Sequence, residues 1–332
     1  MPRIERLTGC LIGQCLGDAL GFPIEGWDGD ACREFVDTKI SKWFQGKVPP
    51  VNDWNGQYTD DSQLARELLE SLVEQGGFAP KDYAGRIARI FRENKIVGRG
   101  LACDDAARRL IEGVGWREAG CDPPAAGNGT AMRAAPVGMF YYDDPAKMIQ
   151  IAHEQGWITH HDPRCSAGSV AIAGGTALAL TGEKIDTDEY ANQVAAWMDG
   201  YHKTFADYVR RLPEWVELSP SEAVTEIAHA GEKPGYVSGW PGISPYVIPS
   251  VLWSLYAFLK YPDSYFDAIA VALAVGGDVD TTAAMTGALS GAYLGIDGMP
   301  RHLAEMVNDD EEWGYRELAR LAEKCREITS QV

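Results

Sequence analysis

Apolar residues recur with helical spacing along most of this chain. Between Asp61 and Gln75, for example, the apolar side chains fall on one helical face, and a Gly-Gly pair ends the segment. Alternating strand patterns are scarce, and no β-hairpin turn separates two alternating runs. The pattern therefore predicts an all-α fold. The segments with helical periodicity are Asp61–Gln75, Lys81–Glu93, Asp104–Glu112, Pro145–Gln155, Ser166–Leu180, Asp188–Leu212, Ser221–Ala230, Ser250–Leu259, Tyr265–Val275, Thr281–Leu294 and Glu311–Thr329.

No acidic or Ser/Gly-rich linker and no internal repeat divides the chain. Residues 1–332 are therefore predicted to form a single domain, a compact orthogonal globule of helices. Residues 232–249 (EKPGYVSGWPGISPYVIP) are rich in Gly and Pro and predict a long loop. A loop of this length in a compact domain usually has a function, so we expect it to flank the active site.

Two series of glycines recur at every fourth position, one near each end of the chain. On a helix this spacing places the glycines on one face, where another backbone can approach closely. Each glycine weakens a helix by roughly 1 kcal/mol relative to alanine, so packing must offset that cost. Dense core packing is one explanation, and the meeting of two helices that bring carboxylates to a shared centre is the other. The series are Gly9, Gly13, Gly17 and Gly21, and Gly287, Gly291 and Gly295.

Composition limits the classes of partner and the location. Forty-eight acidic and thirty basic residues give a net charge of -18, which repels phosphate backbones and anionic lipid. Nucleic acid and membrane surfaces are therefore not expected as partners. Asp18 interrupts the apolar stretch Thr8–Gly21, so we expect neither a membrane span nor a signal peptide. Seven scattered cysteines form no C-x-x-C pair, which disfavours a zinc site and disulfides and predicts a cytoplasmic protein.

Two short motifs each place paired carboxylates beside a hydroxyl group. Helix capping explains either motif alone. If the motifs meet, however, their acids repel one another unless positive charge lies between them. Such a site of oxygen ligands suits two divalent cations of the Mg²⁺, Mn²⁺ or Ca²⁺ type rather than zinc. The motif residues are Thr59, Asp60 and Asp61 in YTDDS, and Asp278, Asp280 and Thr281 in GGDVDTT.

The second acidic motif also fits the D-x-D-x-T start of haloacid-dehalogenase-type phosphatases, which use an aspartate nucleophile and Mg²⁺. In that interpretation the apolar run Ala268–Val275 supplies the preceding strand. Only 50 residues follow Thr282, however, which is too little chain for the rest of such a domain. A Mg²⁺-dependent phosphatase is therefore the weaker alternative.

Three further segments contain polar residues that are candidates for the functional site. The glycine-rich turn from Gly127 to Arg133 exposes backbone amides that can hold a phosphate group, although it is neither a P-loop nor a dinucleotide fingerprint. Arg133 is expected to hold either a structural carboxylate or a ligand. His160 lies in THHDP, ahead of a helix rich in small residues, and Glu25 lies in a turn after the first glycine series. Taken alone, the histidine is a structural residue and the glutamate a solvated one.

In this order the motifs resemble the ADP-ribosylglycohydrolase family, the relatives of dinitrogenase-reductase-activating glycohydrolase and of the ADP-ribosyl-acceptor hydrolases. The resemblance implies a compact all-α fold with a binuclear centre of Mg²⁺ or Mn²⁺. The matching segments are Gly9–Gly26 (GCLIGQCLGDALGFPIEG), Tyr58–Ser62 (YTDDS), Gly127–Gly138 (GNGTAMRAAPVG), Ile158–Pro163 (ITHHDP) and Gly276–Pro300 (GGDVDTTAAMTGALSGAYLGIDGMP).

The resemblance also implies roles for individual positions. Glu25 matches the acidic residue near the scissile bond, and Asp61 is assigned to catalysis with it. Asp18 is expected to be structural, through capping or hydrogen bonds near the site. The metal ligands are expected to be Thr59, Asp60, Asp61, Asp278, Asp280 and Thr281. The substrate-binding residues are expected to be Gly127, Asn128, Gly129, Met132 and His160.

The sequence departs from the family pattern in three places. Ser62 replaces the usual final threonine of the first acidic motif but keeps a hydroxyl group. Ala125 and Ala126 stand where some members carry a serine and an aromatic residue, so the adenine is expected to stack elsewhere. The candidates for that contact are Tyr236, Trp240 and Tyr246, and those for a second acid are Asp104 and Asp105.

The implied reaction is hydrolysis of the glycosidic bond between ADP-ribose and an acceptor. The acceptor is expected to be an ADP-ribosylated protein, with an arginine linkage favoured, or a small ADP-ribosyl derivative. Because family members that lose metal ligands can bind without cleaving, a non-catalytic ADP-ribose-binding module is the main alternative. The presence of every expected ligand in this sequence favours the enzyme.

Overall fold

The computed structural model describes residues 1–231, 235–310 and 312–330, with the side chain of Tyr236 excepted. Its elements confirm the all-α fold and the single compact body, and the described residues contain only isolated β-bridges and no strand. The helices are α1 (Ile4–Gly21), α2 (Gly29–Phe35), α3 (Ser41–Phe44), α4 (Asp60–Gln75), α5 (Pro80–Arg92), α6 (Leu101–Ile111), α7 (Ala135–Phe140), α8 (Pro145–Trp157), α9 (Pro163–Thr181), α10 (Thr187–Met198), α11 (Lys203–Val209), α12 (Leu212–Glu217), α13 (Pro220–Ile227), α14 (Val247–Lys260), α15 (Tyr265–Ala274), α16 (Val279–Leu294), α17 (Arg301–Ala304) and α18 (Tyr315–Thr329). Short turns of other helix types lie at Phe22–Ile24, Val36–Ile40, Asn128–Thr130, Gly235–Val237 and Ile296–Gly298.

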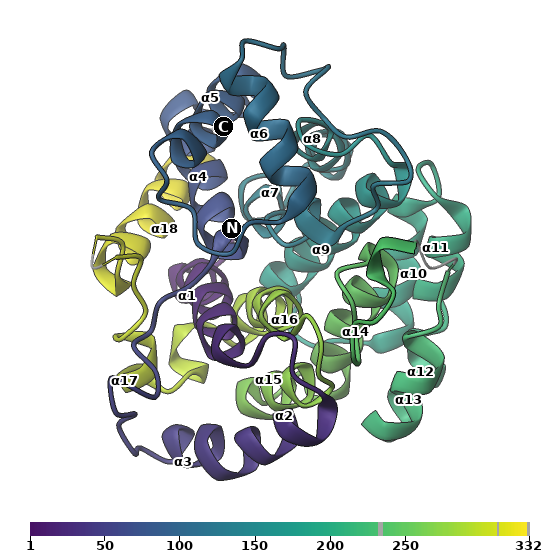
Figure 1. Cartoon of the computed structure of the whole chain (residues 1–332). Helices are drawn as coiled ribbons and strands as arrows, with labels where there is room; N and C mark the ends of the chain where they lie inside the picture. Colours follow the sequence, from purple (N-terminus) through teal and green to yellow (C-terminus); the bar gives the residue numbers. More distant parts are fainter. Residues whose placement is uncertain (232–234, 311, 331–332) are drawn as a thin grey trace.

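Helices α1 and α16 run side by side through the centre of the molecule (Figure 1). Their glycine series face each other: a Cβ on Gly13 would overlap the carbonyl oxygen of Gly287, and one on Gly17 would overlap that of Ala283. Each step of four residues forward on α1 matches four residues back on α16, so the helices are antiparallel. The meeting of two helices that the glycine spacing suggested is therefore confirmed.

This register determines what lies at the end of the helix pair. A Cβ on Gly21, the last residue of α1, would overlap the Cα of Asp280 in the first turn of α16. The turn Phe22–Ile24 then leads directly to Glu25. Because α16 begins where α1 ends, the antiparallel pair places Glu25, Asp278 and Asp280 at one end of the molecule's central helices.

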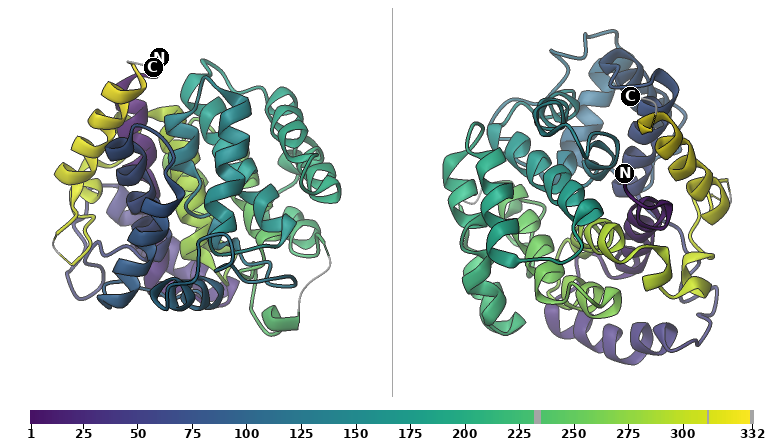
Figure 2. Two further views of the ribbon diagram at one scale, coloured as in Figure 1. Left: turned by 90° about the horizontal axis from the view of Figure 1, so that it is seen from above. Right: turned by 180° about the vertical axis from the view of Figure 1, so that it is seen from behind.

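The other helices surround this pair. Helix α4 packs against α1, α7, α16 and α18, while α9, α14 and α15 pack against α16. Helices α10–α13 lie beyond α9 and α14 on the side away from α1, and α2 and α3 cover another side (Figures 1 and 2). The first turn of α4 is thereby held beside the end of the central pair.

Some predicted elements differ from the structure. The prediction of one helix over Asp188–Leu212 is wrong, because the turn that contains Gly200 separates α10 from α11 and His202 caps α11 by accepting from the Phe205 N–H. The apolar run proposed as a phosphatase strand lies in helix α15 instead. Helix α18 begins at Tyr315, and the predicted start at Glu311 lies outside the described residues.

Asp18 does not exclude a membrane span as expected, although the structure does not test the span itself. By length and composition, Ile4–Ile24 is apolar enough to cross a membrane in spite of Asp18. In the structure, 89% of this apolar window is buried inside the protein. The seven cysteines are all buried and free of disulfides.

Candidate active site

The first turn of α4 is capped by a residue of another helix. Asp18 of α1 is fully buried, and its carboxylate accepts hydrogen bonds from the backbone N–H of Thr59 (3.0 Å), the Thr59 hydroxyl (2.9 Å) and the Ser62 N–H (3.1 Å). These N–H groups are among those that a helix start leaves without internal partners. Asp18 therefore has the structural role expected for it, and it joins α1 to α4.

Because Asp18 provides the cap, Asp60 and Asp61 are free for another purpose. Both are buried, with 7% and 2% of their surface exposed. Asp61 accepts from the Thr59 hydroxyl through Oδ2 (3.0 Å), while its Oδ1 is buried without a hydrogen-bond partner. Asp60 faces the loop after α5, where a Cβ on Gly98 would lie 3.2 Å from Asp60 Oδ1. Local capping thus does not explain this acidic pair.

The second acidic motif is not a helix cap either. Asp278 occupies the N-cap position of α16, but its side chain makes no capping hydrogen bond. Its carboxylate accepts from Asn128 Nδ2 (2.5 Å) and from the Thr281 hydroxyl (3.2 Å) instead. Asp280 accepts from the Thr281 N–H through Oδ1 (2.9 Å). The second oxygen of Asp280 has no hydrogen-bond partner in the described part of the chain.

Glu25 completes a cluster of three acids. One carboxylate oxygen from each of Glu25, Asp278 and Asp280 lies within 4.8 Å of the other two. The turn of Glu25 is fixed by reciprocal hydrogen bonds, from Gly26 N–H to the Gly277 carbonyl (2.8 Å) and from Gly277 N–H to the Trp27 carbonyl (2.9 Å). Glu25 is exposed whereas both aspartates are buried, so it is the member of the cluster that solvent reaches.

The two acidic motifs share one electrostatic environment. Burial, with the charges of Asp18 and Asp278 among the further causes, holds the pKa values of Asp60 and Asp61 well above their usual range. Burial and the neighbouring carboxylates raise the pKa of Asp280 in the same way, and burial raises the pKa of Asp278 to about 7. The charges of Asp278 and Asp280 contribute to the raised pKa values of the first motif, and α4 packs against α16, so the two motifs lie in one acidic region. The group of carboxylates within 4.8 Å of one another, however, contains Glu25, Asp278 and Asp280 but neither Asp60 nor Asp61.

The donor set fits divalent cations. The ligand atoms are hard carboxylate and hydroxyl oxygens, which Mg²⁺ and Mn²⁺ prefer. Across the described residues, none of the acids of the cluster forms an ion pair with lysine, arginine or histidine. Buried carboxylates without such partners are either protonated or neutralised by bound positive charge, so the site can accept cations that replace the protons. The unpartnered Oδ1 of Asp61 is a further oxygen available to an ion.

The glycine-rich turn lies against the second acidic motif. Asn128 donates from Nδ2 to Asp278 and to the Ser250 hydroxyl (2.9 Å), and its backbone N–H donates to the Pro245 carbonyl (3.0 Å). Its donors are thus used within the protein, so in this structure Asn128 positions Asp278. The N–H of Gly129, a buried residue, has no hydrogen-bond partner in the described chain.

Within the Gly/Pro-rich segment 232–249, Ile243 contacts the second acidic motif and Pro245 contacts the glycine-rich turn. The Ile243 carbonyl accepts from the Asp278 N–H (2.8 Å), and Pro245 holds Asn128 as described. Residues 247–249 already belong to α14, and 232–234 lie outside the described residues. The segment is therefore shorter as a loop than the sequence indicated.

The remaining substrate candidates lie near the turn. The ring of His160 lies under it, where a Cβ on Gly129 would be 3.1 Å from His160 Cε1. Met132 is buried, and its carbonyl accepts from Gln14 Nε2 (2.8 Å), which also donates to the Asp61 carbonyl (3.1 Å). Gln14 was not predicted from the sequence, since only the fold brings its two partners together.

The candidates for adenine stacking are not equivalent. The Tyr246 ring is buried, and its hydroxyl accepts from Arg164 (3.4 Å), whereas Trp240 is half-buried. The side chain of Tyr236 lies outside the described part of the chain. Trp240 is therefore the candidate with ring surface that solvent reaches.

The two candidates for a second acid lie outside the acidic cluster. Asp104 pairs with Arg99 (3.1 Å), and Asp105 pairs with Arg108 (3.0 Å). Both are surface ion pairs on α6. The structure gives neither acid a contact with the cluster.

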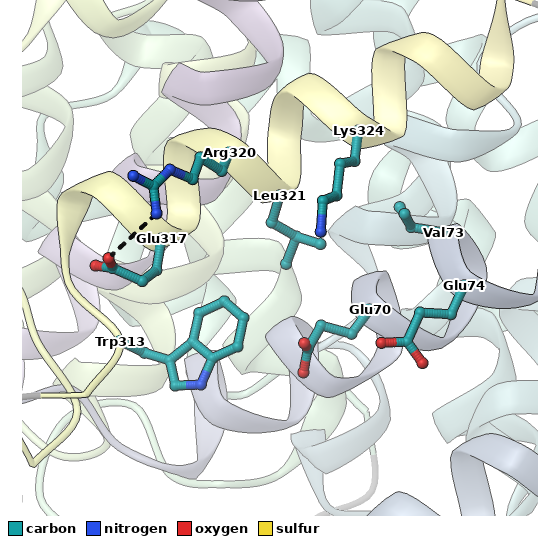
Figure 3. Close-up of a pocket in the computed structure, with 8 residues that line it drawn as sticks. All are labelled: Glu70, Val73, Glu74, Trp313, Glu317, Arg320, Leu321 and Lys324. Carbon is teal, nitrogen blue, oxygen red and sulfur yellow. Dashed lines mark ion pairs between the residues drawn. The ribbon is translucent and has the colours of Figure 1, made fainter.

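A separate cavity of about 200 Å³ lies between α4 and α18 (Figure 3). Its α4 residues Glu70 and Glu74 lie in the C-terminal half of that helix, away from Asp60 and Asp61. Trp313, Arg320 and other α18-side residues form the opposite wall. This cavity is distinct from the acidic cluster.

Comparison with known proteins identifies the family. Residues 1–331 match the family model described as ADP-ribosylglycohydrolase. The chain belongs to the ADP-ribosylglycohydrolase family. The prediction of a hydrolase of this family is confirmed.

Named relatives of this glycohydrolase align over nearly its whole length. It is 28% identical to ADP-ribosylarginine hydrolase Tri1 of Pseudomonas putida, over 99% of this chain and 80% of the relative. It is 26% identical to human ADP-ribosylhydrolase ARH3, over 98% of this chain and 94% of the relative. A solved structure described as an ADP-ribosylglycohydrolase-related protein complex matches with a TM-score of 0.68 and 25% identity, over 99% of both chains.

Proposed function

We propose that this protein is a metal-dependent hydrolase that releases ADP-ribose from an ADP-ribosylated acceptor. The observation that carries the proposal is the close group of Glu25, Asp278 and Asp280, with Asp60 and Asp61 buried in the same electrostatic environment. The family match and the names of the relatives support the reaction class. The turn Gly127–Gly129, with its unpartnered N–H at Gly129, is the proposed binding point for the diphosphate.

Two divalent cations, Mg²⁺ or Mn²⁺, are the proposed cofactors. Their charge would balance the four aspartates of the two motifs. When bound, such ions supply positive charge that orients the hydroxyl groups of the ribose. The proposed ligands are Thr59, Asp60, Asp61, Asp278, Asp280 and Thr281.

Glu25 is the proposed general acid and base. Its exposed position at the edge of the buried aspartates lets it reach a substrate, and burial of part of its side chain raises its pKa above the usual value. In the reaction, water adds to the anomeric carbon as the bond from that carbon to the acceptor breaks. Glu25 accepts the proton that the water loses, and the acceptor gains a proton. Nearby carboxylates, Asp61 among them, stabilise the positive charge that develops on the ribose.

The acceptor that we propose is ADP-ribosylated arginine. The support is the match to the relative named ADP-ribosylarginine hydrolase, which covers 99% of this chain. The test is a panel of arginine-linked, serine-linked and small-molecule ADP-ribosyl substrates, assayed for free ADP-ribose with Mg²⁺ or Mn²⁺ and again with a chelator. We expect metal-dependent release, greatest from the arginine linkage. Binding of ADP-ribose with no release from any substrate would support the binding module instead.

A further inference from the structure

Arg133 is a fully buried guanidinium group whose partners are all neutral. It donates to the Gln155 side chain (2.9 Å), the Gln155 carbonyl (3.1 Å), the Gly129 carbonyl (2.7 Å) and the Thr159 hydroxyl (2.7 Å). No carboxylate pairs with it in the described chain, so the expected structural carboxylate is absent from its surroundings. Buried charges are normally paired with opposite charge. Arg133 therefore places a positive charge without a hydrogen-bonded counterion at the end of the glycine-rich turn, against the Gly129 carbonyl.

The Thr159 hydroxyl group lies within hydrogen-bond distance of both Arg133 and His160 and so links the two side chains. The Thr159 oxygen accepts from Arg133 and lies 2.8 Å from His160 Nδ1. Its hydroxyl proton has only one other acceptor, the Gly156 carbonyl at 3.4 Å. Because the shorter hydrogen bond is the stronger one, Thr159 donates to Nδ1, and the ring proton of His160 is on Nε2.

That proton faces the turn where a ligand would lie. His160 Nε2 has no hydrogen-bond partner in the described residues, and a Cβ on Gly127 would lie 3.5 Å from it. Burial and the charge of Arg133 lower the pKa of His160 to about 3, so the ring is neutral near pH 7. The unpartnered N–H of Gly129 is on the same turn. One unused donor on the turn, the Gly129 N–H, and one beside it, His160 Nε2–H, thus lie near the buried cation.

We propose that Arg133 is a positioning residue: through Thr159 it holds His160 as an Nε2–H donor to the diphosphate of bound ADP-ribose, and its own charge attracts that diphosphate. This inference rests on the proposed function, because it takes ADP-ribose as the ligand. It explains why a cation is buried without a carboxylate. The anion it compensates is supplied by the substrate.

The experiment compares two substitutions of Thr159. Thr159→Val keeps the shape but removes the hydroxyl group, whereas Thr159→Ser keeps the hydroxyl group and is the matched control. The Kd for ADP-ribose is measured by calorimetry, with the Kd for Mg²⁺ measured on the same proteins. The ¹⁵N chemical shifts of the His160 ring, assigned by their loss in His160→Gln, report its tautomer.

We expect Thr159→Val to weaken ADP-ribose binding about tenfold, the cost of one lost hydrogen bond to a charged group, and Thr159→Ser to stay within about twofold. Binding of Mg²⁺ should be unchanged in both variants. The wild-type shifts should show the Nε2–H tautomer, and Thr159→Val should shift its population.

Unchanged ADP-ribose binding by Thr159→Val, or an Nδ1–H tautomer in the wild type, would overturn the inference. Equal weakening of Mg²⁺ and ADP-ribose binding would also overturn it, because that pattern indicates a purely structural role. If the wild-type protein fails to bind ADP-ribose at all, the proposed function fails instead. The two failures are therefore distinguishable.

Discussion

At the scale of residues, the buried acids of the site have different structural roles. Asp18 accepts hydrogen bonds from N–H groups at the start of α4, so Asp60 and Asp61 are not needed to cap that helix. Asp278 starts α16 without capping it and is oriented by Asn128. Acids at helix starts usually serve as caps. Here that explanation fails for both motifs, and the proposed cations would account for the burial of these acids.

Removing one acid from either motif should remove metal binding. Asp60→Asn and Asp278→Asn each delete a negative charge from the cluster, so calorimetric titration with Mg²⁺ should show binding lost or weakened by a factor of ten or more, roughly the effect of 1.4 kcal/mol. Asp104→Asn, which removes an acid of a surface ion pair on α6, is the matched control and should bind Mg²⁺ as the wild type does. Retained binding in both site variants would contradict the assignment of the ligands.

Glu25→Gln should separate catalysis from binding. The amide cannot exchange the proton, so turnover should fall by about 10²–10⁴-fold, the usual contribution of one general acid or base. The Kd for ADP-ribose should stay close to that of the wild type, since the turn at Gly129 is untouched. Full turnover in this variant would show that Glu25 has another role.

At the scale of elements, the central fact is the close crossing of α1 and α16. Their glycines face carbonyl oxygens of the opposite helix, so no side chain fits between them. The close approach offsets the weak helix propensity of glycine through packing. It also fixes the register that places Glu25 beside Asp278. The same contact therefore stabilises the fold and aligns the site.

Two glycine-to-alanine substitutions test this packing. In Gly17→Ala the new methyl group overlaps the Ala283 carbonyl, and overpacking of this kind typically costs about 1–3 kcal/mol of unfolding free energy or more. Gly85→Ala in α5 is the control, because a Cβ there meets nothing within 4 Å and should stabilise the protein by about 0.4–1 kcal/mol. The unfolding free energy of each variant is to be measured by urea denaturation and compared with that of the wild type. Equal stability of the two variants would mean that the crossing tolerates side chains.

At the scale of the whole molecule, the sequence predicts the features that repeat or cluster locally. Helical periodicity indicated most long helices, and the i to i+4 glycines indicated the central crossing. The short helices without a clear period were missed, namely α2, α3, α7, α12 and α17. The roles of Gln14 and Arg133 were missed for a different reason: Gln14 joins Asp61 to Met132, contacts that exist only after folding.

The whole molecule should also respond to pH through its acidic cluster. Asp18 and Asp278 have pKa values near 7 in the fold, against an ordinary value of 3.8. The folded state therefore binds protons that the unfolded state has released, so without metal the free energy of unfolding should fall as pH rises from about 4 to about 7. If Mg²⁺ is the cofactor, as proposed, it should compete with these protons and bind the folded state.

Thermal unfolding with and without Mg²⁺ measures this response. The increase in Tm on adding Mg²⁺ should be small near pH 5 and larger near pH 8, where the carboxylates have lost their protons. The Asp60→Asn variant should show a smaller increase at each pH. An increase that is independent of pH would indicate that Mg²⁺ binds away from the raised carboxylates.

The most direct test of the account is the position of bound metal. Crystals soaked in Mn²⁺ and measured for anomalous scattering should show two Mn²⁺ peaks at the end of the α1–α16 pair, coordinated by oxygens of Asp60, Asp61, Asp278 and Asp280. Mn²⁺ bound only elsewhere on the protein, or no peak between the two acidic motifs at saturating metal, would contradict the claim that these acids form one metal centre.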